Sequence, residues 1–97
     1  MRFLRRRADQ TPPPQITLVD REGCHLCEQA ALVVARVAQA QGADWSRVDV
    51  DSSRDLLHKY ADLVPVVLVD GREVSHWTVT DEALTSAIVR SRRSRRS

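Results

Sequence analysis

The sequence has few aromatic residues, few cysteines and no long apolar run. Aromatic residues make up 4% of the 97 residues, so the hydrophobic core must be built mainly from aliphatic side chains. No run of about 18 apolar residues is present, which excludes a membrane-spanning helix. Three glycines and four prolines exclude a collagen-like or Gly/Pro-rich chain, and two cysteines exclude a disulfide-rich secreted scaffold. The length favours one domain.

The net charge of +2 is unevenly distributed. Residues 1–15 carry a net +3 and residues 90–97 a net +5, whereas the residues between them carry −6. We expect a disordered basic extension (1–14), an ordered domain (15–89) and a disordered Arg/Ser-rich tail (90–97). Basic tails can bind nucleic acid. No aromatic residue for base stacking lies among the tail arginines, however, so nucleic acid is not the favoured partner.

The first seven residues are basic but are not followed by an apolar segment. This pattern is not that of a secretory signal, so we expect a cytoplasmic protein with no membrane partner. In a reducing compartment a cysteine pair is more often redox-active or metal-binding than a structural disulfide.

Hydrophobic periodicity predicts a mixed α/β domain. Apolar residues alternate or cluster where strands are expected and recur every three to four residues where helices are expected. A two-residue Asp70-Gly71 turn joins the last two strands, and we expect Gly42 to end the first helix. The predicted elements are strand 16–20, helix 24–41, strand 45–51, a helix capped by Ser52, strand 64–69, edge strand 72–76 and a helix capped by Thr80. This β-α-β-α-β-β-α order predicts a four-stranded mixed sheet flanked by helices, with a right-handed first crossover.

Cys24-His25-Leu26-Cys27 lies where the first strand gives way to the first helix. A helix N-terminus has unpaired N–H groups and partial positive charge, which stabilise a thiolate and lower its pKa. Cys27 lies about one helical turn after Cys24, a separation compatible with a disulfide. We expect Cys24 to attack a substrate disulfide and Cys27 to resolve the mixed disulfide. His25 either adds to the positive field or points into solvent.

Zinc binding is an alternative for the same motif, because C-x-x-C is half of a common zinc site. The remaining ligands would be His58 and His76, or one of them with His25. His58 and His76 are 18 residues apart, whereas the usual spacing is three to five. We therefore expect no metal, and keep a structural zinc domain as an alternative.

Pro65 opens a strongly apolar predicted strand. Proline cannot donate to a sheet ladder, so its place at the start of a buried strand needs a reason. A cis Val64–Pro65 bond would supply one by turning the chain sharply. A trans proline at the first residue of a strand is the common alternative.

Taken together, this order and spacing resembles the thioredoxin superfamily, and more closely its small glutaredoxin-like members. The resemblance rests on segments 21–27, 48–51 and 63–71. It implies a thioredoxin-like fold, Cys24 as nucleophile, Cys27 as resolving cysteine and a cis Pro65 beside them.

The resemblance also implies a place for substrate. The backbone of Val64 would pair with a bound peptide or glutathione, with His25 nearby. Arg21 would meet one glutathione carboxylate, and Thr80 and Asp81 the other. Glutathione or a reductase would recycle the pair, and no other cofactor is implied.

The sequence departs from the glutaredoxin pattern at three places. His-Leu replaces Pro-Tyr between the cysteines, and Leu63 replaces the threonine before Val-Pro. Ser75 to Val79 replaces the Gly-Gly before the last helix, which places bulky Trp77 at the expected glutathione groove.

We therefore expect a small monomeric thiol–disulfide oxidoreductase. Its partners would be a disulfide-bearing protein or glutathione, together with a thiol reductant or a reductase. A thioredoxin-fold binding module, acting through its basic tails without redox turnover, is the alternative function.

Overall fold

The computed structural model describes residues 12–96 as four strands and three α-helices, with a short 3-10 turn between the second strand and second helix. The elements in chain order are β1 (Gln15–Asp20), α1 (His25–Gln41), β2 (Asp44–Asp49), η3 (Val50–Ser52), α2 (Arg54–Tyr60), β3 (Val66–Val69), β4 (Arg72–His76) and α3 (Asp81–Arg96). This order confirms the predicted α/β architecture. No helix in the described part is both long and apolar enough to cross a membrane.

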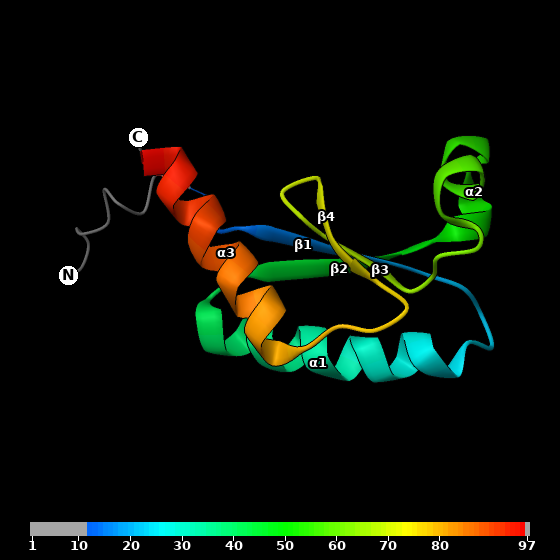
Figure 1. Ribbon diagram of the computed structural model, residues 1–97, viewed down its shortest axis with the longest axis horizontal. Coiled ribbons are helices and arrows are strands. Elements are labelled where there is room, and N and C mark those ends of the chain that lie inside the picture. Colours follow the sequence, from blue (N-terminus) through cyan, green and yellow to red (C-terminus); the bar gives the residue numbers. More distant parts are fainter. Residues whose placement is uncertain (1–11, 97) are drawn as a thin grey trace.

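The four strands form one mixed sheet in the order β2-β1-β3-β4 (Figure 1). β1 and β2 are parallel, with Gln15 opposite Asp44 and Asp20 opposite Asp49. β3 pairs antiparallel to both β1 and β4. Because β1 and β2 run in the same direction, the loops that follow them leave from the same edge of the sheet.

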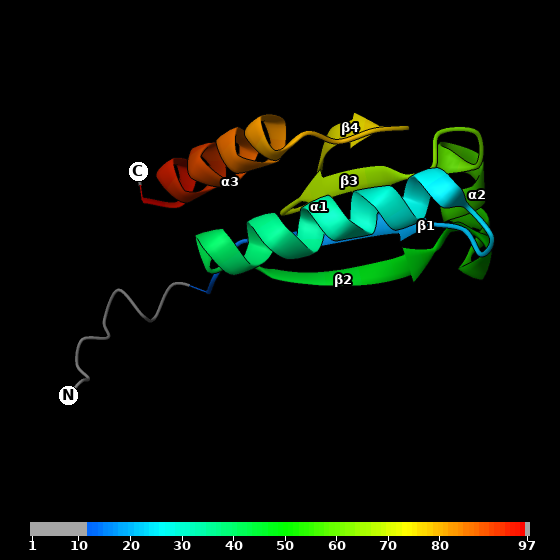
Figure 2. The ribbon, with the colours of Figure 1, turned by 90° about the horizontal axis from the view of Figure 1, so that it is seen from below.

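α1 and α3 cover one face of the sheet, and α2 contributes side chains to a smaller cluster on the other. α1 packs on β1 and β2, α3 packs on β3 and β4, and the two helices contact each other (Figure 2). Side chains alternate between the faces of a strand. Ile16 and Leu18 therefore enter the larger core under α1 and α3. Val19 faces the other way, into a smaller cluster that includes Tyr60 of α2. The buried side chains of both clusters are aliphatic, as expected.

The chain reversals follow the predicted local chemistry. Gly42 ends α1 in the left-handed conformation (φ 66°), and its N–H donates to the Ala38 carbonyl. Asp70 and Gly71, which join β3 to β4, both have positive φ (50° and 84°). Positive φ at both central residues is typical of the type I′ hairpin turn.

The start of α2 differs from the prediction. β2 ends at Asp49, because residues 50–52 wind into η3. The Asp49 carboxylate caps this turn by accepting from the Asp51 N–H at 2.8 Å. The prediction of a Ser52 cap is therefore wrong by one residue: Ser53 caps α2, and its Oγ accepts from the Leu56 N–H at 3.1 Å.

The C-terminal tail also differs from the prediction. Residues 90–96, expected to be disordered, form the last turns of α3. Tertiary contacts anchor them: Ser91 donates to the Asp70 carboxylate, and Arg92 to the Gln41 carbonyl at the end of α1. Arg95 pairs with Asp70 at 3.5 Å. Of the expected N-terminal extension, residues 1–11 lie outside the described residues.

Candidate active site: a cysteine pair at the start of α1

Cys24 and Cys27 are joined by a disulfide at the N-terminus of α1. Their Cα atoms are 5.2 Å apart, within the range that a disulfide allows. Cys24 is the N-cap residue of the helix, and its Sγ accepts the Cys27 N–H at 3.1 Å. A sulfur at this position lies at the positive end of the helix dipole.

The two cysteines differ in solvent exposure. Cys24 is half-buried, whereas Cys27 has no exposed surface. The loop before Cys24 is exposed and turns at Gly23, which has a φ of 77°. Only the sulfur at the helix start is therefore open to an incoming molecule.

The predicted proline loop has the expected conformation. The Val64–Pro65 peptide bond is cis, Pro65 is buried and Val64 is half-buried. The backbone N–H of Trp77 donates to the carbonyls of Pro65 at 2.8 Å and Leu63 at 3.2 Å. The polar groups of Val64 take part in none of the hydrogen bonds found among the described residues.

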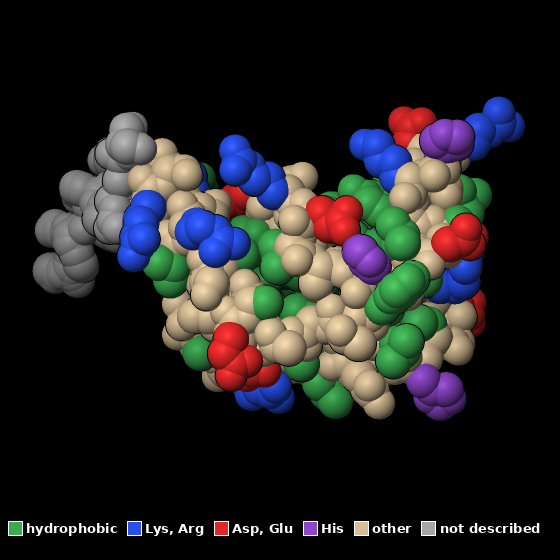
Figure 3. Space-filling model, viewed as in Figure 1, with side chains coloured by type: hydrophobic (Ala, Val, Ile, Leu, Met, Phe, Trp, Pro, Cys, Tyr) green, Lys and Arg blue, Asp and Glu red, His purple; other side chains and the backbone are tan. Residues whose placement is uncertain are grey.

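Trp77 is held firmly although half its surface is exposed. Its φ is 69°, and its indole N–H donates to the Asp62 carbonyl at 3.0 Å. The exposed fractions of Trp77 and Leu26 are 53% and 45%. Hydrophobic side chains gather on this face of the molecule (Figure 3). A groove of about 140 Å³ lies here, lined by Leu26, Gln29, Ala30, Val33, Trp77, Thr78 and Val79. Leu26, one of the two residues between the cysteines, thus borders an apolar groove.

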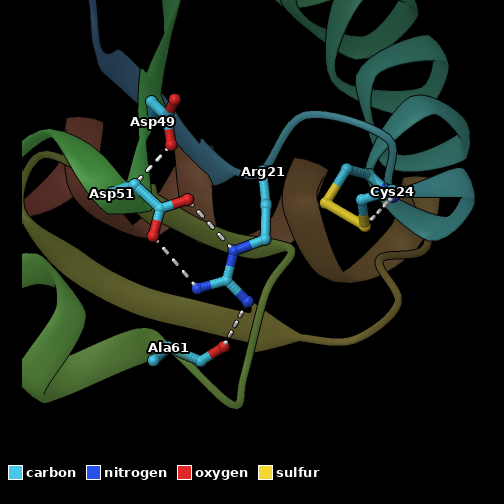
Figure 4. Close-up of polar contacts among 6 residues, drawn as sticks. Arg21, Cys24, Asp49, Asp51 and Ala61 are labelled. Carbon is cyan, nitrogen blue, oxygen red and sulfur yellow. Dashed lines mark hydrogen bonds and ion pairs between the residues drawn. A yellow bond between two sulfur atoms is a disulfide. The ribbon is translucent and has the colours of Figure 1, made fainter.

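Arg21, expected to meet a glutathione carboxylate, is held by internal contacts. Its Nε and one terminal nitrogen donate to the two carboxylate oxygens of Asp51 at 3.2 and 3.3 Å. Its other terminal nitrogen donates to the Ala61 carbonyl at 3.3 Å. The hydrogen bond to Asp51, and then the charge of Asp51, raise the pKa of the Arg21 guanidinium. The guanidinium points toward Asp51 and Ala61 and away from the disulfide (Figure 4).

Thr80 and Asp81 lie at the start of α3. The Thr80 Oγ1 accepts from the Ala83 N–H at 3.1 Å, so Thr80 caps the helix as expected. Asp81 forms a two-point ion pair with Arg36 of α1, at 3.0 and 2.8 Å. The hydrogen bond from Arg36 lowers the pKa of the Asp81 carboxyl. Both charged residues predicted to bind glutathione are thus already paired within the protein.

Sequence reasoning missed Asp51 and Asp62 as parts of this site. Asp51 is 30 residues from Arg21 in the chain. The parallel pairing of β1 and β2 brings the segment after β2 to the same edge as the loop before Cys24. The predicted βαβ unit already implied this parallel pairing, so the sequence did contain a signal that the segment holding Asp51 lies near Arg21. No comparable sequence signal places Asp62 under the Trp77 indole.

The remaining predicted candidates are histidines. His25 is the first residue of α1 and is exposed. Among the described residues, no group of three or more His, Cys, Asp or Glu side chains is placed to hold a metal ion. The zinc alternative therefore has no ligand set in that part of the chain.

A larger hollow, of about 660 Å³, lies between α3 and the β3–β4 hairpin. Arginine side chains line it from both elements, Arg72 from β4 and Arg90 and Arg95 from α3 (Figure 3). None of its lining residues belongs to the cysteine pair or the proline loop.

Comparisons with known proteins identify the family of this chain. The family model described as "Glutaredoxin-like domain (DUF836)" matches residues 15–89. The uncharacterized protein Rv0508 of Mycobacterium tuberculosis is 37% identical over 83 residues, covering 80% of this chain and 86% of that protein.

Two solved structures resemble the fold. Protein Ne2328 from Nitrosomonas europaea superposes with a TM-score of 0.71 at 23% identity, covering 81% of this chain and 95% of that one. Thioredoxin 1 from Thermosipho africanus has a TM-score of 0.60 at 17% identity, covering 86% and 99%. These likenesses show a thioredoxin fold. Because the family model matches residues 15–89, most of its length, the chain belongs to the glutaredoxin-like domain family.

Proposed function

We propose that the protein is a thiol–disulfide oxidoreductase in which Cys24 is the nucleophile and Cys27 the resolving cysteine. The observation that carries the proposal is the asymmetry of the pair. Cys24 is open to solvent at the helix start, and Cys27 is completely buried one turn later. An attacking thiolate needs access and stabilisation, whereas a resolving thiol needs only to reach the first sulfur.

The reaction proceeds in two exchanges. The Cys24 thiolate attacks one sulfur of a substrate disulfide, forming a mixed disulfide and releasing one substrate thiolate. Cys27 then loses its proton and attacks the Cys24 sulfur, which forms the Cys24–Cys27 disulfide and releases the second substrate thiolate. The substrate gains two electrons and the protein loses two. A thiol reductant or a reductase returns the pair to the dithiol.

Three features of the local geometry favour these steps. The Cys27 N–H, which donates to the Cys24 sulfur in the disulfide, is placed to donate to the thiolate after reduction. The backbone groups of Val64, in the buried proline loop, are available to pair with a peptide backbone. The apolar groove beside Leu26 and Trp77 offers a surface for a substrate side chain.

The binding-module alternative draws no support from Arg92 and Arg95, two of the five arginines in residues 90–97. Arg92 and Arg95 use their guanidinium groups to attach α3 to the end of α1 and to Asp70. These two arginines therefore have a structural role in the fold.

A redox titration tests the proposal. The protein is equilibrated across ratios of glutathione to glutathione disulfide, and free thiols are counted by mass after alkylation. We expect both thiols to disappear together at a potential of roughly −200 to −320 mV, the cytosolic range. Thiols that stay reduced at every ratio, or a glutathione adduct on one cysteine as the only product, would contradict the dithiol mechanism.

A further inference from the structure

The charge around the cysteine pair is predominantly negative. Arg21, in the loop that leads to Cys24, is bound by both oxygens of Asp51. The carboxylates of Asp49 and Asp62 are also close enough to act on its charge. One guanidinium therefore contacts one carboxylate and lies in the field of two more.

The second guanidinium in this region is also fully engaged. Arg47 of β2 donates to Asp20 and to Glu28, both at 2.7 Å. Asp20 immediately precedes Arg21, and Glu28 immediately follows Cys27 on α1. Glu22, in the exposed loop before Cys24, has no ion pair within residues 12–96.

Carboxylates thus outnumber guanidinium groups at this edge of the sheet. Two guanidinium groups, those of Arg21 and Arg47, are each committed to carboxylates of the same region. The other cations at this end, Arg54 and Lys59, are exposed on α2, with Asp55 between them in the chain. The seven carboxylates, against four Lys and Arg cations, are those of Asp20, Glu22, Glu28, Asp49, Asp51, Asp55 and Asp62.

We propose that this acidic surround makes the cysteine pair react preferentially with cationic and neutral disulfides, and that Asp51 is a specificity-determining residue. Asp51 contributes a negative charge and also holds Arg21 away from an incoming carboxylate. The substrate class is a polypeptide disulfide flanked by Lys or Arg, and anionic disulfides such as that of glutathione are disfavoured. This inference rests on the proposed function. Charges at a site change encounter rates and contact energies, and salt screens both effects.

Three small disulfides of different charge test the proposal. Cystamine carries two positive charges at pH 7, bis(2-hydroxyethyl) disulfide carries none, and glutathione disulfide is a net anion. Pre-reduced protein is mixed with each disulfide, and samples are quenched by alkylation at a series of times. The fraction of oxidised protein in each sample is then measured by mass spectrometry. Each rate is divided by the rate of the same disulfide with dithiothreitol. This ratio cancels the reactivity of the leaving thiol and the charge of the attacking thiolate.

We expect the normalised rate with cystamine to exceed that with glutathione disulfide by about tenfold at low ionic strength. The preference falls toward one in about 1 M salt, where the Debye length is about 3 Å. A preference of one or less at low salt would overturn the inference. If none of the three disulfides oxidises the protein, the proposed function falls with it.

Single-carboxylate variants locate the effect. Asp51→Asn should lower the cystamine preference by about two- to threefold, since one nearby charge in water changes a rate by about twofold and Arg21 is also released. Glu22→Gln removes an exposed charge that has no ion pair within residues 12–96, and should lower the preference in the same direction without perturbing the fold. Asp44→Asn is the matched control, because Asp44 lies at the opposite end of β2. An equal loss in all three variants would show that the site does not sense local charge.

Discussion

The backbone N–H of Trp77 donates to the Pro65 carbonyl at 2.8 Å and joins the segment after β4 to the cis-proline loop. The indole N–H of the same residue donates to Asp62, just before that loop. One residue therefore fixes two sides of the surface that borders the cysteine pair.

Trp77→Phe should lower the free energy of unfolding by about 0.5–1.5 kcal/mol. Phenylalanine keeps most of the apolar surface but cannot donate to the Asp62 carbonyl, and a typical hydrogen bond contributes this amount. Urea unfolding followed by circular dichroism measures the change. An unchanged midpoint would show that the indole N–H is equally well satisfied by water.

The two cysteines should respond differently to replacement by serine. Cys27→Ser should accumulate a mixed disulfide between Cys24 and the substrate, because the resolving sulfur is missing. Cys24→Ser should neither reduce a disulfide nor form an adduct, because Cys27 is buried. Mass spectrometry after mixing with cystamine distinguishes the two. An adduct on Cys27 in the Cys24→Ser variant would show that the assignment of Cys24 as the nucleophile is wrong.

Leu84 and Leu32 form a matched pair for testing how α3 packs against the rest of the domain. Leu84 has no exposed surface, whereas 68% of the Leu32 surface is exposed on α1. Leu84→Ala should cost about 2–5 kcal/mol, because it removes buried methyl groups and leaves a cavity. Leu32→Ala should cost much less, since its side chain is already largely in water.

Thermal and urea unfolding measure both variants. If Leu84→Ala does not fold, Ile88→Val at another fully buried position of α3 should still cost about 0.5–1.5 kcal/mol. Equal effects of the Leu84 and Leu32 substitutions would contradict the packing of α3.

Asp70 should make stability depend on acid pH. Burial favours the neutral carboxyl, but hydrogen bonds from Ser91 and the Gln15 N–H, with the charge of Arg95, outweigh it and lower the pKa of Asp70 in the folded state. A lowered folded pKa stabilises the protein above the ordinary aspartate pKa of about 3.9, and this contribution is lost as pH falls through the folded value.

Unfolding experiments between about pH 6 and pH 2 test this expectation. Near pH 6 the Asp70→Asn variant should be less stable than the natural chain. Its free energy of unfolding should also fall less between pH 6 and pH 2 than that of the natural chain. Asp44→Asn is the control, because the Asp44 carboxylate has no hydrogen bond or ion pair within the described residues. Parallel pH profiles of the natural chain and Asp70→Asn would contradict the role of Asp70.

Much of the fold could be predicted because its signals are local. The strand–cysteine–helix junction at Cys24, the Gly42 terminus, the Asp70-Gly71 turn and the Thr80 cap each depend on a few neighbouring residues. Backbone preferences and side-chain caps act over the same short range. The aliphatic core likewise follows from composition and periodicity.

Other features depend on where distant segments meet. The pairing of Arg21 with Asp51 depends on the parallel register of β1 and β2. The shift of the α2 cap to Ser53 depends on how the chain leaves that register. The order of the main strands and helices and the position of the cysteine pair could therefore be predicted from local signals in the sequence. Tertiary structure decided which charges meet, and ordered residues 90–96 through contacts with Gln41 and Asp70, because a charged side chain takes its partner from whatever packing brings within reach.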